Sequence, residues 1–396
     1  MKQSYDIMIS GGGVAGLTAA AAFGTAGFSV LIVDPAPPIT NELDKGSDLR
    51  TTAFLQPAQQ FLAEAGIWNR LEAAASSLQV MRIIEGHGDA PEIRDFNAAD
   101  ISDRPFGWNI PNWVLRREMM ARLEELETVT FRTGIGFESM LSRTSEARVR
   151  LTDGTKIVAK LVIAADGRDS PVRHSRGIGA KRETFGQHAL TFAVSHREPH
   201  NDVSTEIHQS GGPFTLVPLP DKEGTHRSSV VWMTQTEHAQ HLLALDTEEF
   251  EARATARSLE HLGRLSLVSP RGSWPIISQI ADRLTAERTA LVAEAAHVVP
   301  PIGAQGLNMS LKDLSCLLEL ATASRNDPGA PEVLDAYSRA RTPDIRLRVS
   351  GVSLLNRTSI AGHPVLQAMR GAGISALHDI APVRRSVMAL GLGARS

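Results

Sequence analysis

The chain of 396 residues contains one cysteine, Cys316, so it cannot form an internal disulfide bond. Cys316 lies in an apolar helical pattern, SCLLEL, and is expected to be a buried structural thiol. No stretch of about 18 uninterrupted apolar residues is present, which excludes a membrane-spanning helix. The first residues, MKQSYDIMISGGG, run from a short apolar stretch directly into glycines, so they are not expected to act as a signal peptide.

The sequence also lacks a strong excess of charge, internal repeats and low-complexity tracts. Its net charge of −3 argues against a nucleic acid as the main partner. At roughly 150 residues per domain, the length predicts about two or three domains. Neither a catalytic triad nor a cluster of metal-ligating residues stands out, so we assign no catalytic side chain and no metal site.

Positive charge is concentrated near the C-terminus. From residue 341 to residue 396 there are eight arginines and two acidic residues, together with apolar residues at helix-like spacing. This pattern predicts a helical segment whose apolar face packs on the body of the protein while its arginines face water. The alternative is a basic surface that contacts anionic lipid or a partner protein.

The first forty residues have the pattern of a βαβ unit. The strand DIMIS is followed by GGGVAG, in which Gly11, Gly13 and Gly16 have G-x-G-x-x-G spacing. These glycines allow a tight turn, close approach of a pyrophosphate, and close contact between helix and strand. After a small-residue helix, the strand FSVLIVD ends at Asp34, where an acid can bind ribose hydroxyls. The unit predicts a bound dinucleotide, and the aspartate favours FAD or NAD over NADP.

The rest of the chain does not continue the regular alternation of a nicotinamide dehydrogenase. DLRTTAFLQPAQQFLAEAGIWNRL reads as helical, whereas residues 185–234 contain apolar segments separated by turn signals, which predicts an antiparallel sheet. Residues 248–262 read as a charged helix, and TALVA reads as a buried strand. A strand-rich domain is therefore expected to interrupt the nucleotide domain.

Three motifs occur in a fixed order: GGGVAG, VIAADGRDSPVR and AAHVVPPIGAQGLN. This set resembles the single-component FAD-dependent aromatic hydroxylases, whose type member is para-hydroxybenzoate hydroxylase. DLRTTAFLQPAQQFLAEAGIW, RPFGWNIPNW and the basic tail are similar to the ubiquinone-biosynthesis hydroxylase branch. The resemblance covers nearly the whole chain.

The resemblance implies an α/β fold, with a Rossmann-like FAD-binding domain interrupted by a mainly antiparallel β-sheet substrate domain and followed by a C-terminal helical segment. The FAD-binding domain is expected to be discontinuous, with residues 1–80, 105–184 and 285–340. The substrate domain takes residues 81–104 and 185–284, and the helical segment takes residues 341–396.

The resemblance also implies which residues bind FAD. They are Gly11, Gly13, Val14, Ala15, Gly16, Asp34, Arg50, Arg116, Asp166, Gly167, Glu294, Pro301, Gly303, Gly306, Leu307 and Asn308. Arg117 is a less well-aligned neighbour of Arg116, and Arg168 is assigned to NAD(P)H. The sequence departs from the family at Ala293–Glu294, where the usual pattern is Gly-Asp. FAD is therefore expected to bind differently or more weakly there.

By analogy with the family, NADH or NADPH reduces FAD, O2 adds at the flavin C4a position, and the distal oxygen of the hydroperoxide is transferred to an electron-rich ring. His297 is expected to pack or to form a local hydrogen bond rather than to act in catalysis. The implied substrate is a prenylated phenol. Its pocket is expected to be lined by Phe192, Phe214, Val217, Pro218 and Trp232, for which a place in the ordinary core is an equal alternative.

The resemblance further implies a cytoplasmic protein. Peripheral contact with the inner membrane or with a quinone-biosynthesis complex through the basic tail, and an oligomeric state, are left open. Two other functions compete with hydroxylation. FGWNIP resembles the W-x-W-x-I-P segment of flavin-dependent halogenases. The altered Ala-Glu pair and the basic tail are compatible with a flavin-free scaffold or prenyl-lipid binding subunit.

Overall fold

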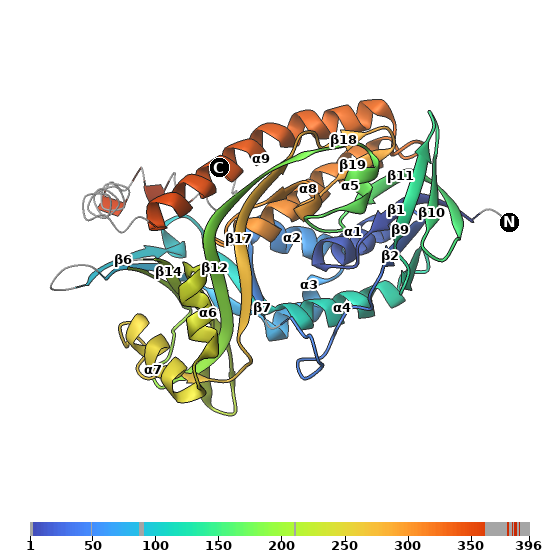
Figure 1. Ribbon diagram of the computed structural model, residues 1–396. Coiled ribbons are helices and arrows are strands. Elements are labelled where there is room, and N and C mark those ends of the chain that lie inside the picture. The colour runs from blue at the N-terminus through green and yellow to red at the C-terminus, as the bar shows by residue number, and fades with distance from the viewer. Residues whose placement is uncertain are drawn as a thin grey trace.

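The computed structural model describes residues 3–48, 50–86, 91–209 and 211–360, together with residues 378, 379, 382, 384, 385 and 388. Two sheets form the two halves of the molecule, and helices lie over and between them (Figure 1). This arrangement confirms the predicted α/β fold. Most of the expected C-terminal segment beyond residue 360 lies outside the described residues.

The first half is built on a sheet with the strand order β18-β19-β11-β1-β2-β8, in which β19 to β8 are parallel, and the pairings of β18, β10 and β9 are antiparallel. The strands are β1 (Gln3–Ser10), β2 (Val30–Asp34), β8 (Val129–Thr133), β9 (Phe137–Ser142), β10 (Ala147–Leu151), β11 (Lys156–Ala164), β18 (Thr285–Ala286) and β19 (Thr289–Leu291). Continuous apolar runs such as VLIVD form its centre because helices cover both faces of a parallel sheet. Helix α1 (Val14–Thr25) packs against α4 (Asn112–Glu124) and α8 (Gln305–Ala323) beside it.

The second half is a nine-stranded sheet with the order β20-β17-β12-β15-β14-β13-β5-β6, in which β16 also pairs with β12. Its strands are β5 (Val80–Glu85), β6 (Glu92–Asn97), β12 (Ala180–His196), β13 (Val203–Gln209), β14 (Gly212–Lys222), β15 (Thr225–Gln235), β16 (Ser266–Leu267), β17 (Gly272–Ala281) and β20 (His297–Val298). Only the pairing of β13 with β5 is parallel among its described pairs. The predicted antiparallel sheet is therefore confirmed. Helices α6 (Thr236–Ala244) and α7 (Thr247–Arg257) cover one face, and α7 ends before the expected residue 262.

A small sheet of three strands lies between the halves: β3 (Thr51–Leu55), β4 (Ser76–Leu78) and β7 (Gly107–Pro111). The expectation of a helix throughout DLRTTAFLQPAQQ is wrong at its start, because residues 51–55 pair with β7. Helix α2 (Gln56–Glu64) begins directly after this strand, with Pro57 in its first turn. The backbone nitrogens of the first turn have no acceptor within the helix, so a proline there costs no hydrogen bond. The short helices are α3 (Trp68–Leu71), α5 (Pro171–Ser175), η1 (Glu72–Ala74), η2 (Ala98–Asp100) and η3 (Ala293–Ala295).

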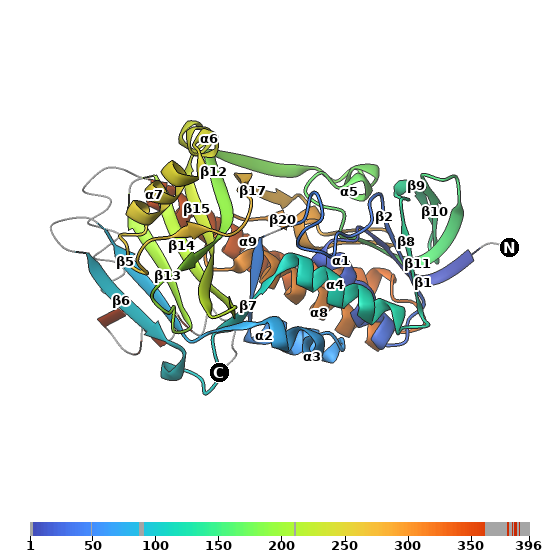
Figure 2. The same ribbon diagram turned by 90° about the horizontal axis from the view of Figure 1, so that it is seen from below.

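Helix α9 (Pro331–Ile360) runs beside α8 and then over the nine-stranded sheet (Figures 1 and 2). The expected boundary between residues 340 and 341 lies inside this helix, so the C-terminal segment does not begin there. Cys316, on α8, is half-buried rather than fully buried. Burial raises the pKa of its thiol, which keeps it protonated. Among the described residues, no helix is long and apolar enough to cross a membrane.

The few described residues beyond 360 contact the second half. Arg384 pairs with Asp100 at 3.2 Å, and His378 lies 3.3 Å from the carbonyl oxygen of Asp95. Met388 is buried against Phe106. The expectation that the arginines from residue 341 onward face water is therefore wrong for Arg384, and also for Arg341 on α9, whose side chain is 2% exposed.

Candidate functional site

The turn between β1 and α1 leaves no space for side chains at two glycines. Gly11 has a φ of +109°, and a Cβ atom there would overlap the carbonyl oxygen of Ala165. A Cβ atom at Gly16 would overlap the carbonyl oxygen of Gly11. At Gly13, in contrast, no atom lies within 4 Å of the Cβ position. Two glycines are therefore required by the fold itself, whereas Gly13 borders open space.

Helix α1 begins at this open space without a side-chain cap. Its N-cap is Gly13, so the first backbone N–H groups, from Val14 onward, have no capping side chain to which they can donate. Free N–H groups at a helix N-terminus favour an anion. Asp34 lies beside the same turn, because its Oδ2 accepts a hydrogen bond of 2.5 Å from the N–H of Gly12.

Strand order brings the separate motifs to one edge. β1 lies between β2 and β11, and β19 pairs with β11, all in parallel. The carboxyl ends of parallel strands meet at the same edge of a sheet, where ligands bind in open α/β folds. The edge therefore carries the Gly11–Gly16 turn, Asp34, the Asp166–Gly167 pair and Glu294.

Asp166 is a buried carboxylate with one unused oxygen. Its Oδ2 accepts hydrogen bonds from the Ser10 hydroxyl and from the Val172 N–H, each at 3.2 Å. Its Oδ1 is buried and has no hydrogen-bond partner in the part of the chain that the structure describes. Burial raises the pKa of Asp166 above its ordinary value. Such an atom matches a hydroxyl donor from a ligand at this edge.

Arg50 and Arg116 converge on a residue that sequence reasoning missed, Asp48. Arg50 donates to both carboxylate oxygens of Asp48, at 2.7 and 2.8 Å, and Arg116 donates to Oδ2 at 3.2 Å. Burial alone would raise the pKa of Asp48, but the hydrogen bonds and charge of Arg50, with Asn112 and Arg116, hold it below its ordinary value. The carboxylate therefore fixes two guanidinium groups in place. The spacing Asp-x-Arg in DLR was the available signal.

The altered Ala293–Glu294 pair has a distinct geometry. Ala293 has a φ of +54°, a left-handed conformation that glycine adopts without strain. The Glu294 carboxylate accepts a hydrogen bond of 3.2 Å from Nε of Arg168. Glutamate thus reaches the residue that we assigned to NAD(P)H, and that assignment stays a prediction. Arg117, the neighbour of Arg116 in the sequence, does not contact Asp48 but pairs with Glu118 at 2.8 Å and is exposed.

The Pro-Pro-x-Gly segment ends in a second left-handed residue, Ala304, with a φ of +55°. Helix α8 begins at Gln305, so Gly306, Leu307 and Asn308 lie in its first turn. This is not the last helix, since α9 follows. The Asn308 side chain is not free: its oxygen accepts from the Leu55 N–H at 2.9 Å and its nitrogen donates to the Ala53 carbonyl at 2.8 Å. It ties the first turn of α8 to β3.

Similarity to known proteins indicates which ligand this edge of the sheet binds. Residues 4–350 match the family described as FAD binding domain. The ubiquinone hydroxylase UbiL of Rhodospirillum rubrum is 32% identical over 98% of this chain and 89% of its own length. The chain belongs to the FAD-binding family, in the branch of the ubiquinone hydroxylases. The 3-demethoxyubiquinol 3-hydroxylase of Escherichia coli is also similar, at 25% identity over 99% of both chains. The crystal structure of p-nitrophenol 4-monooxygenase from Pseudomonas putida shares the fold, with a TM-score of 0.81, 20% identity and full coverage of both chains.

The residues at the sheet edge fit FAD, the cofactor of this flavoprotein family. The space at Gly13, the uncapped start of α1 and the unused oxygen of Asp166 each match a group of a bound dinucleotide. As a member of this family, the chain is an FAD-dependent aromatic monooxygenase with NAD(P)H and O2 as its co-substrates.

Three of the five expected pocket residues lie on the wrong face of the second sheet. Phe192, Phe214 and Trp232 are buried in a cluster with residues of α6 and α7, and Phe192 contacts Phe250 with ring centroids 4.9 Å apart. They form core, as the alternative reading held. Val217 on β14 pairs across the strands with Ser229 on β15, and both lie on the face of the sheet that is turned away from α6 and α7.

The face of the sheet that carries Val217 is the one directed toward the FAD-binding half. The Ser229 hydroxyl lies 2.8 Å from the Thr51 hydroxyl of the small sheet. Pro218 is buried, and its carbonyl oxygen accepts a hydrogen bond of 2.9 Å from Asn109 on β7. Val217 and Pro218 therefore lie near the junction of the two halves.

A cavity of about 490 Å³ lies where the Asp48–Arg50 segment faces the second sheet. It is lined by residues 42–48, Arg50, Thr191, residues 268–272 and Trp274. The Arg50 guanidinium lies over the Trp274 ring, 4.3 Å from its centroid. The cavity therefore joins a residue assigned to FAD with the sheet face that carries Thr191.

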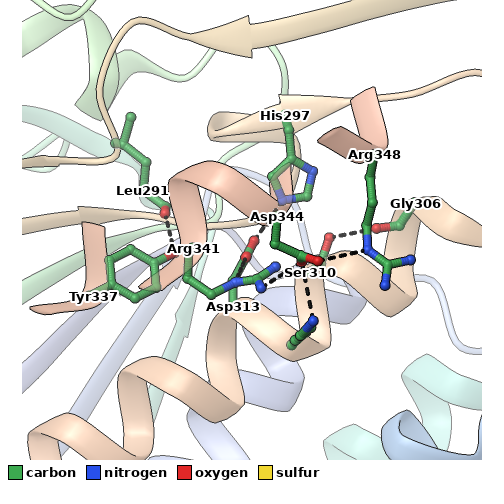
Figure 3. A network of polar contacts seen from close by, with 10 residues as sticks. Leu291, His297, Gly306, Ser310, Asp313, Tyr337, Arg341, Asp344 and Arg348 are labelled. Carbon is green, nitrogen blue, oxygen red and sulfur yellow. Dashed lines mark hydrogen bonds and ion pairs between the residues drawn. The ribbon is translucent and has the colours of Figure 1, made fainter. Parts of the chain in front are cut away.

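A buried network of charges lies behind the flavin motif (Figure 3). Nε2 of His297 lies 2.6 Å from Asp313, whose other oxygen accepts a hydrogen bond of 2.8 Å from Arg341. Arg341 also bonds Asp344 at 2.7 Å, and Arg348 continues the chain to Gln305 at 2.6 Å. His297 thus has the local partner that we expected. The network ties α9 to the first turn of α8.

Proposed function

We propose that this chain hydroxylates the aromatic ring of a polyprenylated phenol in ubiquinone biosynthesis. FAD would be the cofactor, NADH or NADPH the reductant and O2 the co-substrate. Support comes from the two hydroxylases with ubiquinol or ubiquinone in their names, which match this chain over nearly its full length.

The contact of Ile302 with the second sheet is the observation that carries this proposal. Ile302 lies in the Pro-Pro-x-Gly loop and packs against a cluster formed by Ala189, Met233 and Ile276. An apolar surface of the substrate sheet therefore lies directly against the loop assigned to the flavin ring. An apolar ring with a prenyl chain suits such a surface because burial of apolar area favours binding.

Each group of this chain has a defined task in the proposal. The uncapped start of α1 would hold the pyrophosphate, and the guanidinium groups fixed by Asp48 would neutralise its charge. The first turn of α8 would place its N–H groups, with their partial positive charge, beside the pyrimidine end of the flavin. Bound FAD supplies the oxygen transfer, and the apolar sheet face holds the substrate and excludes water.

The test uses the purified full-length chain with 2-prenylphenol as the probe. We expect bound flavin absorbance, NAD(P)H oxidation that the probe stimulates, and a product heavier by one oxygen atom. A deletion strain should accumulate a quinone intermediate that lacks one hydroxyl group, as identified by mass. A protein that stays colourless after incubation with FAD would favour a scaffold, and a chloride-dependent product would favour a halogenase. Neither alternative is favoured by the relatives that match.

We further propose a cytoplasmic protein that contacts the membrane surface or a partner through α9 and the residues beyond it. Leu347, Leu354 and Leu355 on α9 are 74%, 59% and 58% exposed, next to several arginines. Flotation with anionic vesicles should carry the protein upward, and neutral vesicles should not. Equal recovery of the protein in the floating fraction with anionic and with neutral vesicles would contradict contact with an anionic membrane surface. An oligomer is tested by light scattering of the same sample.

A further inference from the structure

Two titratable side chains on β13 form a buried pair outside the FAD edge. Nε2 of His208 lies 2.8 Å from Oε1 of Glu206, and the two side chains are only 9% and 11% exposed. The hydrophobic clusters of the fold do not include either residue. Burying an imidazole–carboxylate pair costs desolvation free energy, so the surroundings of this pair in the sheet indicate what it does.

The pair lies on the face of the sheet that is directed toward the flavin loop. Ile207, between the two residues, packs in the cluster under α6 and α7. Successive side chains of a strand point to opposite faces, so Glu206 and His208 point away from that cluster. This is also the face that carries Ser229 and Val217.

Strand register relates His208 to the loop. His208 is opposite Pro213, and because Phe214 is opposite Trp232, Pro213 is level with Met233. Ile302 of the Pro-Pro-x-Gly loop packs against the cluster that contains Met233. His208 therefore lies two strands from Met233 in one row, a separation of roughly 10 Å.

Glu206 lies in the next row, which leads to the cavity. It is opposite Thr215, which is opposite Val231, and Val231 is opposite Thr191. Thr191 lines the cavity of about 490 Å³. The pair and the cavity thus share one face of the sheet. A ring held against Ile302 with its oxygen directed along the row would point toward His208.

One nitrogen of His208 is unused. Its Nδ1 is buried and has no hydrogen-bond partner among the residues that the structure describes. A neutral imidazole that donates Nε2–H to a carboxylate keeps a lone pair on Nδ1 and accepts there. Buried polar atoms without partners are rare in folded proteins, and they point to a ligand or to water.

We propose that Nδ1 of His208 accepts the hydroxyl proton of the phenol substrate, a step that rests on the proposed function. The O–H bond breaks, its electron pair stays on the phenol oxygen, and the proton forms a new bond to Nδ1. The imidazolium is stabilised by the Glu206 carboxylate. The phenolate delocalises its charge into the ring, whose carbons then attack an electrophilic oxygen more readily. After transfer, the proton returns to the product or to water, so no other reactant is needed.

The charges around His208 favour this role. Glu206 comes from its own strand, and Glu85 lies opposite it on β5 and is 6% exposed. Neighbouring β14 presents the apolar Pro213. Arg257 approaches from α7, where it donates to the carbonyl oxygens of Ile207 and Gly212. Two carboxylates therefore lie on the same side of the sheet as the imidazole.

The test compares His208→Gln with the wild-type holoenzyme, using 2-prenylphenol and measuring hydroxylated product. At pH 7 we expect kcat for product to fall about 10²-fold or more, as for loss of a general base. KM, FAD content and NAD(P)H oxidation should change little. The residual rate of the variant should rise about tenfold per pH unit toward pH 10, because a phenol ionises by itself near that pH. A ring-fluorinated 2-prenylphenol, which is more acidic, should restore part of the rate.

His196→Gln is the matched control. His196 is also buried, but both of its nitrogens have partners, the Glu198 carbonyl at 2.8 Å and the Ser228 hydroxyl at 2.9 Å. This variant should keep the wild-type ratio of product to NAD(P)H oxidised. If His208→Gln fails to fold, Glu206→Gln, which keeps the imidazole, must show a shift of the pH profile in the same direction.

A wild-type pH profile in His208→Gln, or in Glu206→Gln where the first variant fails to fold, would overturn the assignment. A loss of product by the same factor at every pH, without recovery on the fluorinated ring, would overturn it too, since that indicates a structural role. Absence of any hydroxylated product from the wild-type enzyme is a separate result. It would refute the proposed function, and this inference would fall with it.

Discussion

Gly13→Ala separates binding of FAD from stability of the fold. Gly13 has a φ of −71° and a ψ of 176°, which any residue can adopt, and its Cβ position has no neighbour within 4 Å. Alanine restricts the unfolded chain, which stabilises the fold by about 0.4–1 kcal/mol. It is also a poorer N-cap than glycine, by an amount of similar size. The two effects oppose each other, so the free energy of unfolding of the apoprotein should change by less than about 1 kcal/mol.

Binding of FAD should respond much more strongly. The open space at Gly13 is where the backbone must approach the pyrophosphate, and an added methyl group would occupy it. Overpacking by one methyl group costs about 1–3 kcal/mol. This corresponds to a Kd for FAD that is roughly 5- to 150-fold higher, since 1.4 kcal/mol is tenfold.

Gly16→Ala provides the contrast, because a Cβ atom there would overlap the carbonyl oxygen of Gly11 even without FAD. Its apoprotein should therefore unfold at a lower temperature than that of Gly13→Ala. The assay is thermal unfolding of each apoprotein, followed by titration with FAD, monitored by flavin fluorescence. An unchanged Kd in Gly13→Ala would refute the placement of the pyrophosphate. A loss of apoprotein stability equal to that of Gly16→Ala would refute the reading of open space.

Three further predictions concern stability. Ala293→Gly should raise the melting temperature slightly: relief of a left-handed alanine gains about 1–2 kcal/mol, and the flexibility of glycine costs about 0.5–1 kcal/mol. A lower melting temperature would contradict the positive φ of Ala293. Asp313→Asn should destabilise the protein by about 3–5 kcal/mol in urea, because the buried Arg341 would lose its fully buried carboxylate partner and keep only the partly exposed Asp344; a change below 1 kcal/mol would contradict this. Burial alone would raise the pKa of Asp344, but Arg341 and Arg348 lower it to about 2. The ionised Asp344 therefore stabilises the folded protein above its ordinary pKa of 3.8, and this contribution is lost as the pH falls toward 2. Asp344→Asn should flatten this acid dependence, and an unchanged slope of stability between pH 4 and pH 2 would refute it.

Local signals made the first βαβ unit predictable, whereas distant pairing hid other elements. DIMIS, GGGVAG and FSVLIVD carry their period and their turn residues within one short stretch. Residues 51–55 form a strand only because β7, more than fifty residues away, pairs with them. The helix α2 that follows is amphipathic, and no turn residue separates it from the strand, so the sequence predicts one helix over both.

The site was predictable where residues belong to a motif and obscure where they depend on which face of a sheet is covered. Both faces of the nine-stranded sheet are covered, one by α6 and α7 and the other by α9 and the loop with Ile302. Large apolar residues are then found on either face, so Phe192 and Phe214 could not be placed from the sequence. In TEIHQ, polar residues alternate with Ile207 as in a strand with one solvated face, and this pattern concealed the burial of His208.

The path of α9 limits how the two halves can move. Its first part is fixed to α8 by Arg341 and Asp313, and its last part is fixed to the sheet by Asn356, whose amide donates to Gln187 at 3.0 Å. A helix of 30 residues spans about 45 Å, and it joins the halves through contacts on both sides of Pro343, where one backbone hydrogen bond is missing. Hinged opening would have to break buried contacts at one end. We therefore expect substrate and product to pass by movement of the loops that border the cavity, residues 42–48 and 268–272, while the angle between the two sheets stays constant.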